Sequence, residues 1–419
     1  MDGQVRFEHE LLAVETEHDV HVMFELTVPE APRGGARRPL RIGLAVDRSG
    51  SMAGAKLATV QRCARYLVER LDPEDAIALV AFDDDVRLVS SLRSPDVAAL
   101  APGIASIRPG GMTNLSGGWL KAVEEVRRRD DGVRRVLLLT DGLANQGVTD
   151  PSQLTAVARA TSQQGISTTT IGVGDGFAEE LLTGIADAGG GRGWFAESVE
   201  DIPAIFAQEF DDLVAVVAQN VSLELRPAGE VQLLEVLNDY PSVGVEGGVQ
   251  VQLGDVFSGQ RLRVVLRLHI PNLVSLGVQQ VAELVLRYVT VGEEVVSHRS
   301  TFPLLVNAVS AEEAAGAAPD PEVTDEVVVL SAARATDRAR KLADEGRHAD
   351  ASGLLRETVA QLREVAPRSC ASEELFRQAQ VLELTSEELD TTTYSPAMRK
   401  RLHYRAHEMK RRHRQRDEG

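Results

Sequence analysis

The chain has 419 residues, too many for one ordinary domain, so two to four folding units with sizeable cores are expected. Its 43% hydrophobic and 26% charged residues are typical of a globular protein and exclude disorder as the dominant state. The formal net charge of −18 disfavours non-specific binding to nucleic acid or to an anionic membrane surface, because both would repel the chain.

Two cysteines, Cys63 and Cys370, are too few for a disulfide framework, and Cys63 lies on the apolar stripe of a predicted helix, where a buried thiol is expected. Residues 1–10 lack the basic start and the apolar stretch of a secretory signal. No later stretch reaches the roughly 20 apolar residues that a helix needs to cross a bilayer. We therefore predict a cytoplasmic protein with no membrane-spanning segment.

Residues 1–37 form the first segment of the chain. Alternating apolar and polar residues, as in the run 20–28, predict two strands within residues 5–29. A basic connector containing proline and glycine follows at residues 29–38. Because two strands alone cannot make a stable sheet, we expect this segment to join a later all-β unit.

Residues 38–219 alternate short apolar runs with amphipathic stretches, which predicts a doubly wound, Rossmann-like α/β domain. The predicted strands are residues 40–46, 76–82, 135–139, 167–173 and 193–196. Apolar residues recur at helical spacing between them, so each predicted helix can cover one face of the sheet. The clearest stripes are Leu57, Val60, Ala64, Leu67, Val68 and Leu71, and then Ile202, Ile205, Phe206, Phe210, Leu213 and Val217.

The rest of the chain divides into an all-β and a helical part. Residues 220–310 return to a two-residue alternation, as in 221–225 and 262–268, which predicts a β-sandwich domain that residues 1–37 would complete. Residues 311–321, rich in alanine, glutamate and proline, are expected to be a linker. Residues 322–419 predict a helical region with a basic tail, including a glycine-punctuated pair of helices within 333–365.

Three separated motifs place oxygen-bearing side chains at one edge of the predicted parallel sheet. The first turn reads D-R-S-G-S at residues 47–51, which alone is also the composition that any strand-to-helix turn prefers. A second loop contains Thr113, and a third follows the buried strand with Asp141. Parallel strands present their carboxyl ends at one edge, where such folds bind ligands. Hydroxyl and carboxylate oxygens together suit a hard cation such as Mg²⁺.

The order and strand context of these motifs resemble the von Willebrand factor A family, whose metal-ion-dependent adhesion site joins Asp-x-Ser-x-Ser, a Thr and an Asp from three loops. The likeness covers residues 38–217 and extends through the T-I-G-V-G run at 170–174, which is similar to a core strand of the family. Outside this span the chain is only loosely similar to bacterial cytosolic proteins with such a domain. The five matching positions are Asp47, Ser49, Ser51, Thr113 and Asp141.

This resemblance implies a bound Mg²⁺, with Mn²⁺ or Ca²⁺ as alternatives, held by the hydroxyls of Ser49, Ser51 and Thr113. Asp47 and Asp141 would act directly or through water. One coordination position would stay open for an Asp or Glu of a protein partner, so the resemblance implies a non-enzymatic interaction module. The order of metal domain, β-sandwich and helical region also resembles, by analogy, vesicle-coat proteins that carry the same domain.

Two other functions stay open. A cation beside Asp47 and Asp141 could activate water in a hydrolase or phosphoryl-transfer enzyme, although no base and no lysine or arginine clamp is evident near these loops. The basic residues within 399–416 could contact nucleic acid. Against that, Met398, Leu402 and Met409 recur at near-helical spacing and favour docking of this helix on the protein itself.

Three weaker features are interpreted as structural. The acidic triplet at 83–85 is expected to be a solvated tip after its strand, outside the metal site. Asn145, four residues after Asp141, is expected to stabilise a turn rather than to orient Asp141 or a partner. The G-V-G-D-G run at 172–176 has the wrong spacing for a dinucleotide loop and predicts a tight turn after a strand.

Overall fold

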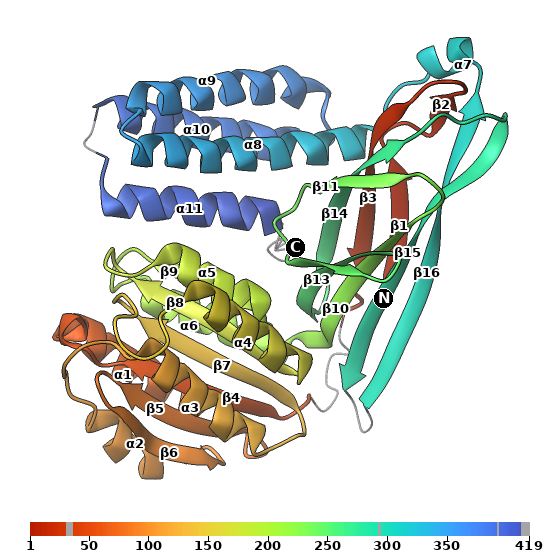
Figure 1. Cartoon of the computed structure of the whole chain (residues 1–419). Helices are drawn as coiled ribbons and strands as arrows, with labels where there is room; N and C mark the ends of the chain where they lie inside the picture. The colour runs from red at the N-terminus through yellow and green to blue at the C-terminus, as the bar shows by residue number, and fades with distance from the viewer. Residues whose placement is uncertain (31–36, 292–294, 392–393, 412–419) are drawn as a thin grey trace.

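The computed structural model describes residues 1–30, 37–291, 295–391 and 394–411, and its elements form three groups that pack against one another (Figure 1). An α/β unit lies below a group of helices in this view, and a pair of large sheets lies beside both. Most of the expected basic connector (residues 31–36) and the end of the expected basic tail (residues 412–419) lie outside the described residues.

A six-stranded sheet forms the centre of the α/β unit, in the order β6-β5-β4-β7-β8-β9. Neighbouring strands are parallel except for β5 and β6, which are antiparallel. The doubly wound α/β fold expected from the sequence is therefore confirmed. The strands are β4 (Leu40–Asp47), β5 (Ala76–Phe82), β6 (Val86–Arg93), β7 (Val133–Thr140), β8 (Ile166–Val173) and β9 (Gly190–Ala196).

Helices cover both faces of this sheet. One apolar core joins the sheet to α1, α2 and α6, and a second joins it to α3, α4 and α5. Because both faces are covered, β4, β5 and β8 are buried along their whole length. Cys63 on α1 is buried as expected, and burial raises its pKa to about 11. The helices are α1 (Ala55–Arg70), α2 (Val97–Ala105), α3 (Leu115–Arg127), α4 (Pro151–Gln163), α5 (Glu179–Ala188) and α6 (Ile202–Val214).

The structure corrects three details of the α/β unit. The edge strand β6 was not predicted, because most of its residues are exposed and the apolar run that indicates a buried strand is missing. Strand β9 begins at Gly190 rather than at Gly193, since its glycine-rich start weakens the strand pattern. Helix α6 ends at Val214, so Val217, expected on its apolar stripe, lies in the next strand.

Two further sheets face each other across a shared apolar core. Their strand orders are β1-β3-β14-β11 and β12-β13-β10-β15-β16-β2. Phe24 and Leu26 of one sheet and Leu223 and Leu284 of the other are among the buried residues of this core. The strands are β1 (Asp2–Phe7), β2 (Leu11–Ala13), β3 (His18–Thr27), β10 (Val216–Pro227), β11 (Gln232–Val236), β12 (Ser242–Val245), β13 (Gly248–Phe257), β14 (Arg261–Ile270), β15 (Gly277–Val291) and β16 (Val295–Val309).

The N-terminal segment contributes to both of these sheets. It forms three strands, where the sequence indicated two, because the three-residue β2 is too short to show an alternation. Strand β3 pairs antiparallel with β14 from His18 opposite Ile270 to Thr27 opposite Arg261. Strand β2 pairs parallel with β16. Along the chain, the α/β unit is thus inserted between strands that pair with each other.

Four long helices follow the sheets and share an apolar core: α8 (Pro321–Asp344), α9 (His348–Val365), α10 (Ser372–Thr391) and α11 (Pro396–Arg411). The linker expected at residues 311–321 instead contains a short helix, α7 (Ala311–Ala315). Ser310 and Glu313 cap its start reciprocally in a capping box. The S-x-x-E spacing at these positions was the available signal for this helix start.

A buried ion cluster joins the α/β unit to the sheets. The Arg135 guanidinium on β7 lies 3.0 Å from Asp255 Oδ2 on β13 and 3.6 Å from Glu209 Oε1 on α6. Ser167 Oγ also donates to Asp255 Oδ2, at 2.6 Å. Because Arg135 and Ser167 lie near the starts of their strands, this contact joins the β sheets to the amino edge of the parallel sheet, opposite the edge where the strands end.

Candidate metal centre

The three loops that carry the predicted ligands open at the carboxyl edge of the α/β sheet. Strand β4 ends at Asp47, and its neighbour β7 ends at Thr140, directly before Asp141. Helix α3 begins at Leu115, two residues after Thr113. The parallel register therefore brings the first and third loops together, and the start of α3 brings the second.

Asp47 is fully buried, and both of its carboxylate oxygens accept hydrogen bonds. Oδ1 accepts from the Ser49 backbone N–H at 2.7 Å, and Oδ2 accepts from Thr140 Oγ1 at 2.5 Å. Burial raises the pKa of Asp47, and these hydrogen bonds from Thr140 and Ser49 oppose the shift. The two hydrogen bonds fix the orientation of the Asp47 carboxylate at the start of the turn after β4.

Asp141 is buried beside the first loop and has two close partners. Its Oδ1 accepts a hydrogen bond from Ser51 Oγ at 2.7 Å, and Ser51 Oγ lies 3.2 Å from Ser49 Oγ. Its Oδ2 lies 2.5 Å from the Lys56 ammonium group. The two serine hydroxyls and the aspartate thus form one connected cluster, and Lys56 supplies the positive charge beside it.

Thr113 approaches the same cluster from the second loop. A Cβ built on Gly142 would lie 3.0 Å from Thr113 Oγ1 and 3.9 Å from both Asp47 Oδ2 and Ser51 Oγ. Oxygens of the first and second loops therefore lie near one point beside Gly142 of the third loop, and Asp141 joins them through Ser51. Asn145 holds this arrangement, since its Oδ1 accepts the Thr113 backbone N–H at 2.9 Å. Asn145 was expected only to stabilise a turn, but it also bonds directly to the backbone of Thr113.

The chemistry of this donor set fits a hard divalent cation. It contains three neutral hydroxyls and two carboxylates, all oxygen donors, which Mg²⁺ and similar ions prefer. Within the part of the chain that the structure describes, no group of three or more His, Cys, Asp and Glu side chains could hold a metal. An ion at the sheet edge would therefore depend on hydroxyl ligands. The two buried aspartates outweigh the single charge of Lys56, so a cation would be attracted.

The acidic triplet is only in part the solvated tip that the sequence suggested, because Asp84 and Asp85 are exposed but Asp83 is not. Asp83 is buried, and its Oδ1 lies 2.6 Å from the Arg48 guanidinium. Its Oδ2 accepts the Gly111 backbone N–H at 3.1 Å, and Asp84 accepts that of Met112. These carboxylates therefore brace the loop before Thr113. The paired glycines at 110 and 111 were the missed signal, because a Cβ at either position would collide with Asp83 or Asp84.

The expectation that no lysine or arginine lies near these loops is also wrong. Lys56 contacts Asp141, and Arg48 contacts Asp83. Lys56 stands at the second position of α1, nine residues after Asp47, and its ammonium reaches back over the first turn. A Cβ on Gly174, in the turn after β8, would lie 3.6 Å from the same ammonium. A cationic side chain therefore occupies one side of the site.

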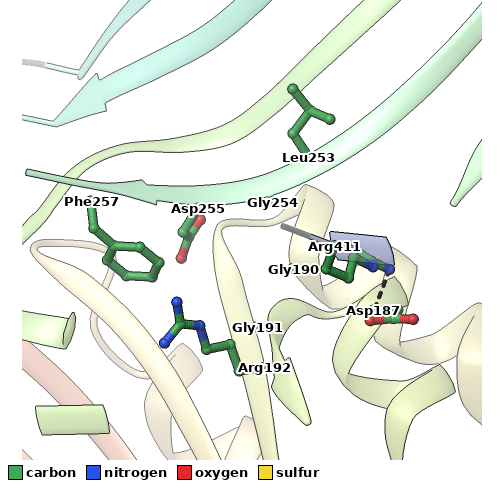
Figure 2. A pocket seen from close by; sticks show the side chains of 9 residues that line it. All are labelled: Asp187, Gly190, Gly191, Arg192, Leu253, Gly254, Asp255, Phe257 and Arg411. Carbon is green, nitrogen blue, oxygen red and sulfur yellow. Dashed lines mark ion pairs between the residues drawn. The ribbon is translucent and has the colours of Figure 1, made fainter. Parts of the chain in front are cut away.

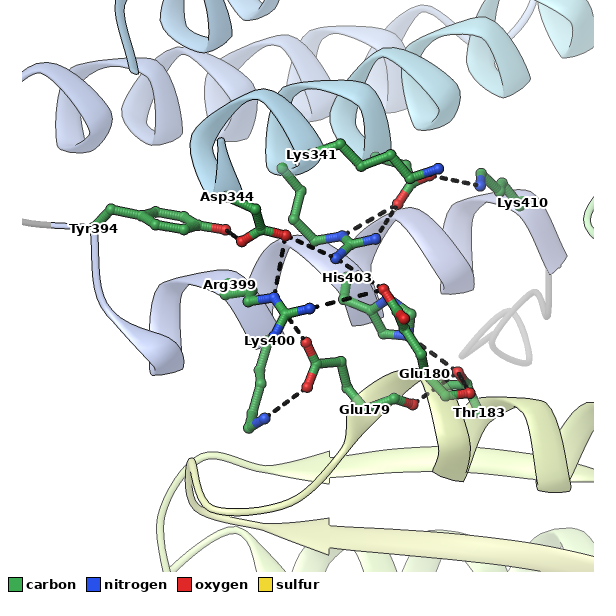
Figure 3. A network of polar contacts seen from close by, with 12 residues as sticks. Glu179, Glu180, Thr183, Lys341, Asp344, Tyr394, Arg399, Lys400, His403 and Lys410 are labelled. Carbon is green, nitrogen blue, oxygen red and sulfur yellow. Dashed lines mark hydrogen bonds and ion pairs between the residues drawn. The ribbon is translucent and has the colours of Figure 1, made fainter. Parts of the chain in front are cut away.

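The basic helix α11 uses its charges within the protein. Figure 3 shows the Lys400 ammonium beside Glu179 of α5, at 2.7 Å, and it also donates to the Phe177 carbonyl oxygen at 2.6 Å. Tyr404 packs into the core of the α/β unit, with its ring 5.4 Å from that of Phe195. The docking of this helix on the protein's own surface agrees with the apolar spacing in its sequence.

The far end of α11 closes a crevice between the α/β unit and the sheets (Figure 2). Arg411 pairs with Asp187 at 2.8 Å, and the Arg192 guanidinium stacks over the ring of Phe257 at 5.5 Å. Burial raises the pKa of Asp187, but Arg411 and His407 outweigh that effect and lower it to about 2. The crevice is thus lined by charges that already have partners.

Comparisons with known proteins place the α/β unit in a family. A model of the von Willebrand factor type A domain matches residues 42–208. The uncharacterized protein sll0103 of Synechocystis is 27% identical over 263 residues, which are 60% of this chain and 62% of that protein. The chain therefore spans less than two thirds of this relative's length.

Solved structures extend the likeness over nearly the whole chain. A protein described as von Willebrand factor type A from Catenulispora acidiphila aligns with a TM-score of 0.71 at 15% identity, covering 94% of this chain and 97% of that one. A human COPII-coat protein aligns with a TM-score of 0.56 at 12% identity, covering 93% and 60%. At these identities the likeness concerns the fold alone, and it agrees with the arrangement expected by analogy with vesicle-coat proteins.

Within residues 1–30, 37–291, 295–391 and 394–411, no helix is both long enough and apolar enough to cross a membrane.

Proposed function

Because residues 42–208 of this chain are a von Willebrand factor type A domain, we propose that the protein is an interaction module that binds an acidic residue of a protein partner through a divalent cation. The observation that carries the proposal is the convergence of oxygens from three loops beside Gly142. Such a site gives recognition through a charge-assisted bond in a partly desolvated place.

Each predicted ligand has a role in this proposal. Ser49, Ser51 and Thr113 would hold the cation through their hydroxyls, and Asp47 and Asp141 would act directly or through water. Mg²⁺ is the proposed ion, with Mn²⁺ or Ca²⁺ as alternatives. The bound ion supplies positive charge at a position that a partner carboxylate can reach. Neutral hydroxyl ligands leave much of that charge uncompensated, which strengthens its attraction for an acidic group.

The remainder of the chain is proposed to present this domain to its partner. We propose a division into an α/β domain at residues 38–219, a β-sandwich domain at 220–310 completed by residues 1–37, and a helical region at 322–419. The pairing of β3 with β14 supports the discontinuous β domain. The anchoring of Asp255 at the amino edge of the α/β sheet supports a fixed orientation, with the candidate metal site directed away from the β domain.

Calorimetric titration with Mg²⁺ and Mn²⁺ tests the metal site. We expect saturable heat from the wild type and none from the Ser49→Ala, Ser51→Ala double variant, because two neutral ligands are removed without a change in charge. The matched control is the Ser90→Ala, Ser91→Ala double variant, which removes two hydroxyls from the edge strand β6. Equal heats from the wild type and the Ser49, Ser51 variant would exclude these hydroxyls from the site.

Metal-dependent enzymatic hydrolysis is the second candidate, and Lys56 is the observation that favours it. An ammonium 2.5 Å from Asp141 could stabilise negative charge that develops on a phosphate ester. Turnover of generic phosphate esters by the wild type, lost in Asp141→Ala, would favour the enzyme over the interaction module. No turnover, together with capture of a partner that a chelator releases, would favour the interaction module.

Nucleic-acid binding through the basic tail has less support. Lys400 and Arg411 are buried in contacts with Glu179 and Asp187, so their charges are not available to phosphates. Salt-sensitive binding of nucleic acid that disappears on removal of residues 412–419 would support nucleic-acid binding as the function.

A further inference from the structure

Four large apolar side chains are exposed around the candidate metal site. They are Val86 (36% exposed), Met112 (49%), Leu143 (56%) and Val148 (40%), and we call them the apolar rim. Met112 directly precedes the proposed ligand Thr113, and Leu143 follows Asp141 by two positions. Large apolar side chains on loops tend to be buried on contact with a partner when they gather beside a polar site.

Contacts between the loops place the apolar rim on one side of the site, at the start of α3. A Cβ built on Gly142, the neighbour of Leu143, would lie 3.0 Å from Thr113 Oγ1. The Val148 backbone N–H donates to Ser116 Oγ at 2.9 Å. A Cβ built on Gly117 would lie 2.8 Å from Val86 Cγ2. All four residues therefore lie on segments next to residues 113–117.

The opposite side of the site is polar and cationic. Lys56 pairs with Asp141 there. The turn after β8 lies beside the ammonium, since a Cβ built on Gly174 would be 3.6 Å from it, and this turn carries the exposed Asp175. The edge of the sheet thus carries exposed apolar side chains around the start of α3 and a cationic side chain beside Asp141. Asp83 and Asp84 add charge at the loop before Thr113. A ligand that matches only the cation would leave the apolar rim in water.

We propose that the partner segment carries a large apolar residue within two positions of its acidic residue. The acidic group would bind at the cation, and the apolar side chain would cover the apolar rim. In an extended segment each residue advances about 3.3 Å, so a neighbour within two positions stays within reach of loops that flank the ion. This inference rests on the proposed function, and it adds the class of peptide that the site selects.

Binding of two blocked peptides to the full chain tests the inference. Both peptides share a central aspartate, flanked by leucine at the two nearest positions on each side in one peptide and by serine in the other. In Mg²⁺ we expect the leucine peptide to bind at least about fivefold tighter by fluorescence anisotropy, because apolar area leaves water. A chelator should abolish the binding of both peptides.

Variants locate the preference on the apolar rim. Met112→Ser and Leu143→Ser should each reduce the preference for the leucine peptide and leave the Mg²⁺ heat unchanged. Val97→Ser is the matched control, because Val97 is 39% exposed at the start of α2. Val97 comes shortly after Arg93, which pairs with Ile77 near the start of β5. It therefore lies toward the amino edge of the sheet, opposite the candidate metal site. This control should keep the full preference.

The outcomes separate the two proposals. Equal Mg²⁺-dependent binding of both peptides would overturn the apolar-rim inference and leave the proposed function in place. Mg²⁺ heat without binding of either peptide would also overturn the inference. No Mg²⁺ heat from the wild type would overturn the metal-dependent function itself, and the inference with it.

Discussion

The Lys56 ammonium places a positive charge within 2.5 Å of Asp141 Oδ2, where the proposed cation would also seek negative charge. Two cations compete for one carboxylate, and the closer they are the more strongly they repel. The Lys56 side chain is partly exposed and can turn toward solvent. Lys56 balances the charge of Asp141, and we therefore expect it to oppose entry of the proposed ion.

Replacing Lys56 with methionine should strengthen metal binding. Removal of a like charge near the ion is worth about 1 kcal/mol at a solvent-accessible site, or about a fivefold lower Kd for Mg²⁺ by calorimetry. Lys121→Met is the control, because Lys121 on α3 pairs with Glu124 rather than with a candidate ligand. An unchanged or higher Kd for Lys56→Met would show that this ammonium does not compete with the ion.

The residues of the candidate site differ in how far the sequence could predict them. Asp47 and Thr113 follow from motif order and from the meeting of parallel strand ends at one edge. Lys56, Asp83 and Asn145 act on those loops through contacts that no spacing rule in the sequence identifies. Their partners are known only once the loops are placed in space.

The contacts of helix α11 with the α/β unit include a deeply buried ion pair. Lys400 is 4% exposed and Glu179 3% exposed, and the Phe177 carbonyl oxygen accepts a further hydrogen bond from the lysine. Removal of one partner leaves a buried charge without compensation, which costs much more than the loss of an exposed pair.

The Lys400→Met variant should therefore lower the free energy of unfolding by about 3 kcal/mol in denaturant titrations. Arg399 also lies 3.2 Å from Glu179 and would compensate part of the loss. Lys341→Met provides the comparison, since Lys341 is 63% exposed and pairs with Asp337 on the surface of α8. If both variants were equally stable, the docking of α11 would not depend on the buried pair.

His403 gives the same interface a defined pH dependence. Burial lowers its pKa to about 3, with His407 and Arg340 adding to the shift and Glu179 and Asp337 opposing it. Its Nε2 lies 3.0 Å from Thr183 Oγ1 on α5. The unfolded chain binds a proton at this position near pH 6.5 and the folded chain does not, so acid favours unfolding.

The contribution of neutral His403 to the free energy of unfolding is fully present above pH 6.5. It declines as the pH falls from 6.5 toward 3, by at most about 1.4 kcal/mol per pH unit. A His403→Gln variant keeps a polar side chain beside Thr183 but does not titrate. We expect its free energy of unfolding to fall less steeply than that of the wild type between pH 6 and pH 4. If the free energy of unfolding fell equally steeply with pH in the wild type and the variant, protonation of His403 would not destabilise the folded protein.

At the scale of elements, periodicity predicted the buried strands of the α/β sheet and the apolar stripes of α1 and α6. In the helical region it indicated only a pair of helices within 333–365 and did not separate α10. It missed β6, whose exposed residues carry no apolar run, and α7, whose five residues are too few for a helical stripe. For α11, the apolar spacing was the only sequence feature that favoured docking on the protein over nucleic-acid binding. The sequence could not identify Glu179 as the partner of Lys400, because 221 positions separate them.

At the scale of the whole molecule, contacts between the units hold the candidate metal site in a fixed position. Arg135 and Asp255, 120 positions apart, join the α/β unit to β13 at the edge opposite the site. Asn238 and Tyr240 of the β part donate to the carbonyl oxygens of Lys410 and Arg411 at the end of α11. Local patterns carry no information on such long-range contacts, so the sequence predicted the order of the units but not how they pack.

The pairing of the N-terminal strands with the later β unit can be tested by cutting the chain between them. A protease site inserted within residues 31–36 separates residues 1–30 from the rest. We expect the cut fragment to stay bound during size-exclusion chromatography in native buffer, because β3 pairs with β14 along its whole length. Phe24 also buries its ring in the shared core, 5.2 Å from that of Phe302.

A Phe24→Ala change in the same cleavable chain should release the fragment more readily, since the loss of a buried phenylalanine costs about 3–5 kcal/mol. The Val86→Ala variant, with a change on the exposed edge strand β6, should retain the fragment as the unchanged chain does. Elution of residues 1–30 apart from the unmutated chain would mean that these strands add little to the β unit. The α/β unit would then be better described as following a separate N-terminal segment than as inserted into a β domain.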